Sequence, residues 1–284
     1  MRDAGSDAPE PHVVLTDLLE QVGRAAVAQG KVALIHMDEV QNITSAEALS
    51  QVLIALGDAI TRKIRVEVPG LGHIERSLPI AVYLTGLPEF DESSEVRRGA
   101  TFSRRFSKTM LEPLSDEDIR ASLQELITPG WEVLRGDGQP GIVRLHPDAA
   151  ELIVGLSRGE PFLFQLAGER AWNAGTSDVI TREDVEWGWA QAAPEAAAHV
   201  ERVLDRLPTR ERAFLEAMAR LDPGARYQTK IAAAAGFAKP TDAGPASQRL
   251  DKVRGIINRG KPYSFRHRAV EAYLTSTWPE IEPD

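Results

Sequence analysis

Apolar residues recur every three or four positions in two stretches near the start of the chain. Residues 16–30 and 45–60 both have this spacing, which is typical of helices that bury one face. Thr16 and Ser45 stand at the starts of the two stretches, where a side-chain oxygen can accept hydrogen bonds from the first backbone N–H groups. We therefore expect two helices here, preceded by a polar, disordered leader over residues 1–11.

Continuous apolar runs alternate with these two helices. Residues 30–43 and 78–90 each contain such a run, and a short third strand is expected within residues 102–115. Residues 65–77 contain two glycines and are expected to form a loop. Strands that are apolar throughout and alternate with helices predict a parallel α/β sheet covered on both faces.

Polar residues follow each of the two longer runs. The first ends at Asp38 and Glu39, and the second ends at Thr85. In open parallel sheets, ligands bind at the carboxyl ends of the strands. An aspartate there can hold Mg²⁺, and a neighbouring glutamate can orient or deprotonate a water molecule, as in the Walker B arrangement of P-loop ATPases. The alternative is that the two acids are only the polar start of a loop.

Four segments, taken in order, resemble the second half of a AAA+ ATPase of the STAND or origin-recognition-like type. They are ALIHMDEVQNI, PIAVYLTGLPEF, SRRFSKTMLEPLSDEDI and SRGEPFLFQLAGERAW. The resemblance implies that Asp38 binds Mg²⁺ and the ATP that carries it, that Glu39 activates water, and that Thr85 senses the γ-phosphate. It also implies that Arg104 or Arg105 reaches a nucleotide, either in the same chain or in a neighbouring subunit of a homo-oligomer.

The chain departs from this family at the phosphate-binding motif. It contains no GxxxxGK[ST] sequence; in the nearest candidate, Gly23 and Gly30 enclose six residues instead of four, and Val32 replaces the Ser or Thr. A P-loop must also lead into a helix, whereas this segment leads into a strand. Phe162 stands near the place where many relatives carry a nucleotide-sensing arginine. The sequence thus resembles the back part of a longer ATPase, from a late start codon or a truncated or split gene; the alternative is a nucleotide-free descendant.

A helical lid is expected after the sheet. Four helices are predicted between residues 114 and 204, with caps at Ser115, at Pro147 or Asp148, at Glu160 and at Thr181. The same region contains GLSRG, which fits the GxSxG hydrolase elbow, with Ser157 as nucleophile and His199 or His267 as its base. That elbow requires a preceding strand, and the residues before Ser157 have helical spacing instead.

The C-terminal residues are expected to form a winged helix. Helices are predicted over residues 209–221, 227–237 and 244–260, followed by a strand centred on residues 263–265 and a last helix. In winged-helix proteins the third helix enters the major groove of DNA and the wing contacts its backbone. The expected phosphate contacts are Lys230, Arg249, Lys252 and Arg266, and the expected base contacts are Ser247 and Gln248.

Charge distribution favours the same interpretation. The segment from Arg226 to Arg268 contains ten basic and two acidic residues, a net charge of +8. The net charge of the whole chain is −9, so the remaining residues together carry −17. A basic C-terminal segment on an acidic chain indicates a duplex-DNA partner, and a solvated basic surface is the alternative. The absence of cysteine excludes disulfides and thiol chemistry. No apolar run is long enough for a membrane span, so a cytoplasmic protein is expected.

The predicted organisation has three parts. Residues 1–113 form a partial AAA+ core, residues 114–204 an all-α lid, and residues 205–284 the winged helix. The predicted function is an ATP-driven switch coupled to DNA, with ATP and Mg²⁺ bound only by a version that contains a P-loop. Hydrolysis is expected of that version and not of this chain by itself. The alternative is a non-catalytic DNA-binding or scaffold protein derived from an ATPase.

Overall fold

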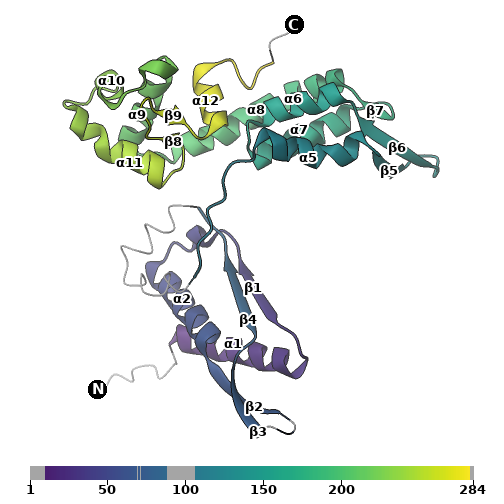
Figure 1. Cartoon of the computed structure of the whole chain (residues 1–284), viewed down its shortest axis with the longest axis vertical. Coiled ribbons are helices and arrows are strands. Elements are labelled where there is room, and N and C mark those ends of the chain that lie inside the picture. The colour runs from purple at the N-terminus through teal and green to yellow at the C-terminus, as the bar shows by residue number, and fades with distance from the viewer. Residues whose placement is uncertain (1–9, 69, 71, 88–105, 282–284) are drawn as a thin grey trace, which may run out of the picture. The chain divides into compact units, whose positions relative to one another are not determined.

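The computed structural model describes residues 10–68, 70, 72–87 and 106–281 of the 284-residue chain. Packing divides the chain into two units, Met1–Thr109 and Met110–Asp284. Figure 1 shows the helices and strands of each unit. In the described residues no helix is both long and apolar enough to cross a membrane.

Two helices of the first unit match the predicted ones, with one corrected start. Helix α1 (Pro11–Ala28) begins at Pro11, with Glu10 in the N-cap position, so the predicted cap at Thr16 is wrong. Thr16 lies within the helix, where its hydroxyl donates to the carbonyl oxygen of His12 (2.7 Å). Proline at the first helical position supplies the start instead, because its fixed φ suits a helix and its missing N–H is not needed there.

The second helix confirms the prediction. Helix α2 (Ala46–Thr61) has Ser45 as its N-cap, and the Ser45 hydroxyl accepts a hydrogen bond from the backbone N–H of Ala48 (3.2 Å). The buried residues of α2 recur at helical spacing, as the sequence pattern requires.

The two predicted apolar strands are present and pair in parallel. Strand β1 (Ala33–Met37) lies beside β4 (Ile80–Leu84), in a register that runs from Ala33 opposite Ile80 to Met37 opposite Leu84. The two strands therefore end at the same edge of the sheet, which is the arrangement that the positions of the polar residues require.

The two faces of this sheet differ in burial. Ile35 and Val82 pack against a cluster that includes Leu56 of α2. On the opposite face Leu34 and Tyr83 are 64% and 63% exposed. Parallel sheets are normally covered on both faces. The predicted cover on the second face is not found among the described residues.

A hairpin stands where a loop was expected. Strands β2 (Lys63–Val68) and β3 (Gly72–Ser77) pair antiparallel over their whole length, so the loop predicted over residues 65–77 is wrong. The two glycines serve the turn, since Gly70 and Gly72 both have positive φ. The predicted third strand is absent from residues 106–115, and residues 102–105 lie outside the described part.

The second unit contains the four predicted helices after the sheet. They are α5 (Asp116–Ile127), α6 (Pro147–Ser157), α7 (Pro161–Ala174) and α8 (Arg182–Asp205). Ser115 and Thr181 form capping boxes at α5 and α8, and Glu160 occupies the N-cap position of α7, as predicted. The cap of α6 is His146 and not Pro147 or Asp148.

This region is not all-α as predicted. Strands β5 (Trp131–Leu134) and β6 (Pro140–Leu145) form an antiparallel hairpin, and β7 (Val179–Ile180) pairs in parallel with β6. The strands are short and mostly exposed, so they contain no continuous apolar run that would indicate them in the sequence.

The last part of the chain has the predicted order of three helices, a hairpin and a helix. Its elements are α9 (Thr209–Ala219), α10 (Gln228–Ala234), α11 (Gly244–Lys252), β8 (Ile257–Asn258), β9 (Ser264–Phe265) and α12 (Arg268–Thr275). Strands β8 and β9 pair antiparallel. Helix α11 ends eight residues before its predicted end at residue 260, because β8 begins within the predicted helix.

One hydrophobic core extends through the whole second unit. It runs from Ile119 in α5 to Trp278 after α12, and it includes residues of α8 and α9 on both sides of the predicted domain boundary at residues 204 and 205. The indole N–H of Trp189 in α8 also donates to the carbonyl oxygen of Pro279 (2.7 Å). The predicted lid and winged helix are therefore packed together as one compact unit.

Candidate functional site

Asp38 and Thr85 lie side by side at the carboxyl ends of β1 and β4. Each follows directly after the last residue pair of the parallel register, Met37 and Leu84. The Thr85 hydroxyl donates to Oδ1 of Asp38, and the backbone N–H of Glu39 donates to the same oxygen (2.9 Å). Both hydrogen bonds lower the pKa of the Asp38 carboxyl because they stabilise its ionised form, and the bond from Thr85 has the larger effect.

Glu39 is held in an uncommon backbone conformation. Its φ is +51°, in the left-handed region that non-glycine residues seldom adopt. Its carboxylate accepts a hydrogen bond from the side-chain amide of Asn42 (2.7 Å). Asn42 belongs to the 3₁₀ turn η1 (Val40–Asn42), which begins directly after the two acids. Strained backbone of this kind persists where surrounding contacts hold it, and it often marks a functional site.

Backbone hydrogen bonds fasten this turn to the end of β4. The N–H of Thr85 donates to the carbonyl oxygen of Met37 (3.0 Å), and the N–H of Val40 donates to the carbonyl oxygen of Thr85 (3.0 Å). Val40 is buried, with 4% of its surface exposed. The two strand ends therefore form one structure, in which Asp38, Glu39 and Thr85 face solvent.

The carboxylate oxygen available at this edge suits a cation whose other ligands come from a bound molecule and from water. Both described hydrogen bonds to Asp38 end on Oδ1, which leaves Oδ2 for a metal ion. Within the described ranges no group of three or more His, Asp or Glu side chains could hold a metal ion. Mg²⁺ bound here would take its remaining ligands from phosphate oxygens and water, as it commonly does in proteins.

Two further predicted features of this site have different outcomes. Arg104 and Arg105 lie outside the described residues. Phe162 stacks on the ring of His199, with ring centres 4.5 Å apart, so it is a packing residue of the second unit. The segment from Gly23 to Gly30 is not a phosphate-binding loop, because Gly23 lies inside α1. Gly23 allows close packing there, since an added Cβ would be 2.8 Å from Leu78.

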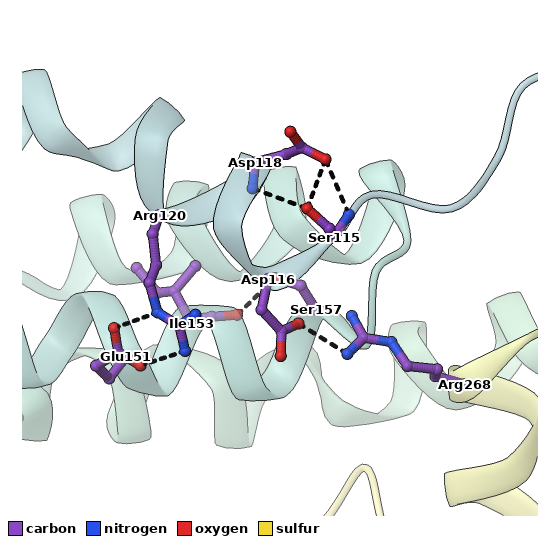
Figure 2. A network of polar contacts seen from close by, with 8 residues as sticks. All are labelled: Ser115, Asp116, Asp118, Arg120, Glu151, Ile153, Ser157 and Arg268. Carbon is purple, nitrogen blue, oxygen red and sulfur yellow. Dashed lines mark hydrogen bonds and ion pairs between the residues drawn. The ribbon is translucent and has the colours of Figure 1, made fainter.

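The GxSxG alternative is excluded by the structure. Ser157 is the last residue of α6, not the tip of a strand-to-helix turn, and it is fully buried. Its hydroxyl donates to the carbonyl oxygen of Ile153 (2.5 Å), as Figure 2 shows. His267 caps α12, and its Nε2 lies 3.4 Å from a carboxylate oxygen of Glu160.

The predicted DNA contacts on α11 and the hairpin are only partly available. Ser247 is fully buried and donates to the carbonyl oxygen of Gly244 (3.0 Å), so the prediction that it faces bases is wrong. Arg249 donates to Glu211 (2.7 Å), and Arg266 donates to Asp251 (3.0 Å) and to Asn258. Three of the predicted residues are exposed: Lys230, Gln248 and Lys252. The Nζ of Lys252 lies 3.7 Å from a carboxylate oxygen of Asp251.

The charge count overstated the basic surface of this region. Arg226 is 4% exposed and pairs with Glu271 (2.6 Å). Arg268 pairs with Asp116 at the start of α5 (2.7 Å), as Figure 2 shows. Glu271 and Asp116 both lie outside the segment in which charges were counted. Several arginines that seemed free in the sequence are therefore neutralised by acids distant along the chain.

The residues of η1 were missed by the sequence analysis. Gln41 and Asn42 both contact the site, Asn42 through Glu39 and Gln41 through the backbone of Leu87. Their position directly after the two acids was the only available signal, and it does not distinguish them from ordinary loop residues.

No protein-family model matches this sequence, and no curated protein does so either.

Proposed function

We propose that this chain supplies the Walker B and sensor part of a AAA+-type ATP site in a cytoplasmic, ATP-driven switch. One observation carries the proposal: Asp38 and Thr85 meet at the carboxyl edge of two parallel strands, with Glu39 next to them. A bound ATP with Mg²⁺ would supply the phosphoanhydride bond and the charge that polarises it. Asp38 would hold the metal ion, and Glu39 would take a proton from water. Thr85 would fix the Asp38 carboxylate and sense the γ-phosphate.

The exposed face of the sheet supports an additional structural element. Among the described residues this sheet has two strands, and such small sheets are marginal by themselves. Leu34 and Tyr83 leave an apolar surface exposed on one of its faces. A strand that carries a P-loop would pair along β4, and its helix would help to cover this face. We propose that the P-loop comes from outside this sequence, either from residues that precede it or from a partner. Arg104 or Arg105 would then contact a nucleotide in the same or a neighbouring subunit of a homo-oligomer.

Calorimetric titration with Mg-ATP tests this proposal. We expect the chain by itself to bind more weakly than the low micromolar range, because its sequence contains no glycine-rich loop to cradle phosphates. Joined at its N-terminal end to a strand, P-loop and helix, it should bind Mg-ATP and be more stable. Low-micromolar binding by the chain alone would mean that another element holds the phosphates. If Mg-ATP is bound neither by the joined protein nor by the chain mixed with a partner that supplies the P-loop, the proposal fails.

A second candidate function is duplex-DNA binding by the C-terminal residues. It is favoured by the order of three helices and a hairpin, with Gln248 and Lys252 exposed on α11 and Lys230 exposed on α10. In a winged helix these positions would lie near the groove and the phosphates. DNA binding would couple the switch to its target, or it would be the whole function of a non-catalytic protein.

Salt-dependent binding to duplex DNA tests this second function. The full chain should bind more weakly as salt rises, because each lysine–phosphate contact releases counterions. Lys230→Glu and Lys252→Glu should each weaken binding to all sequences alike and reduce the salt slope by about 1. Lys63→Glu, which makes the same charge change on the β2–β3 hairpin, is the control. Binding that is absent at low salt, or equally weakened by all three variants, would leave the C-terminal region as a packing element.

A further inference from the structure

The side chain of Gln41 joins the turn after the two acids to the residues after β4. Its Oε1 accepts a hydrogen bond from the backbone N–H of Leu87 (3.2 Å), across 46 positions of sequence. Gln41 is half-buried. Gly86 permits the close approach, since a Cβ at this position would lie 2.8 Å from Gln41 Oε1 and 2.9 Å from Val40 Cγ2.

Thr85 is therefore held on both sides. The Thr85 N–H donates to the carbonyl oxygen of Met37. After Thr85 the chain is held twice, by the Val40 N–H on the Thr85 carbonyl oxygen and by Gln41 on the Leu87 N–H. The Thr85 hydroxyl lies between these attachments and donates to Asp38. If the Gln41 attachment were lost, only the Val40 hydrogen bond would hold the backbone after Thr85, and the direction of the hydroxyl would be less fixed.

We propose that Gln41 is a positioning residue, which fixes the chain after β4 so that the Thr85 hydroxyl stays on the Asp38 carboxylate. This inference rests on the proposed function, in which that carboxylate holds Mg²⁺. The chemistry of the side chain suits the task. An amide oxygen accepts the Leu87 hydrogen bond without adding a third negative charge next to Asp38 and Glu39, so it competes weakly with them for the cation.

Nuclear magnetic resonance of the full chain tests this role through two readouts. One is the χ1 rotamer of Thr85, from couplings to its methyl group, and the other is the hydrogen exchange of the Leu87 amide. In the unsubstituted protein Thr85 should occupy a single rotamer. Gln41→Leu should leave Thr85 averaged over rotamers and speed exchange of the Leu87 amide about fivefold, as expected for one lost hydrogen bond. Gln41→Glu keeps an acceptor oxygen at the same position and should restore both readouts.

A second route to the same result does not change Gln41. Gly86→Ala should push the Gln41 amide away from Leu87 and average the Thr85 rotamer in the same way. A single Thr85 rotamer in both Gln41→Leu and Gly86→Ala would overturn the positioning role alone. Rotamer averaging in the unsubstituted protein would instead mean that Thr85 is not bound to Asp38, and the proposed nucleotide site would fall with it.

Discussion

Glu211→Gln is expected to destabilise the second unit by about 3–5 kcal/mol, the usual cost of removing one partner from a buried ion pair. The Glu211 side chain is 4% exposed, and it accepts from Arg249 (2.7 Å) and from Arg254 (3.2 Å), whose side chain is 10% exposed. Without the carboxylate, the largely buried guanidinium of Arg254 would lose the counter-charge of Glu211. Urea unfolding followed by circular dichroism measures the loss.

Glu216→Gln is the matched control for this substitution. Glu216 lies on the same helix, α9, and pairs with Arg212 (2.9 Å), but both side chains are 42% exposed. Such surface pairs contribute about 0.5 kcal/mol or less. If the two substitutions cost the same, Glu211 does not act as a buried counter-charge.

Glu39→Gln should reduce ATP hydrolysis by the joined, P-loop-containing protein about 10²–10⁴-fold, the usual contribution of a general base. Binding of Mg-ATP should stay near that of the unsubstituted protein, because Asp38 would still hold the metal ion. Asp38→Asn should weaken Mg-ATP binding itself, since it removes the anionic ligand. Phosphate release at saturating ATP and calorimetric titration separate the two effects.

Glu67→Gln is the control, because it removes a carboxylate from the β2–β3 hairpin and should leave both quantities unchanged. Hydrolysis that survives in Glu39→Gln and Asp38→Asn alike would show that the two acids are only the polar end of a strand. A loss of binding in Glu39→Gln would assign Glu39 to the metal ion rather than to water.

Features that depend on neighbours within a few residues could be predicted from the sequence. Ser45, Ser115 and Thr181 cap helices as expected, because a capping side chain bonds to N–H groups only three positions ahead. The apolar runs of β1 and β4 also predicted two parallel strands, with Asp38 and Thr85 at their carboxyl ends. Both follow from local periodicity and from the rule that parallel strands end at one edge.

Features that depend on distant residues needed the tertiary structure. Strand β3 is exposed along its whole length, so no buried apolar face marks it in the sequence, and its pairing with β2 identifies it. Ser247 is buried and Arg249 is paired because α9 packs beside α11 and brings Glu211 across 38 positions. The contact of Gln41 with Leu87 spans 46 positions. A sequence pattern records which residues could be buried or paired, but the partner that neutralises a charge is chosen by packing in space.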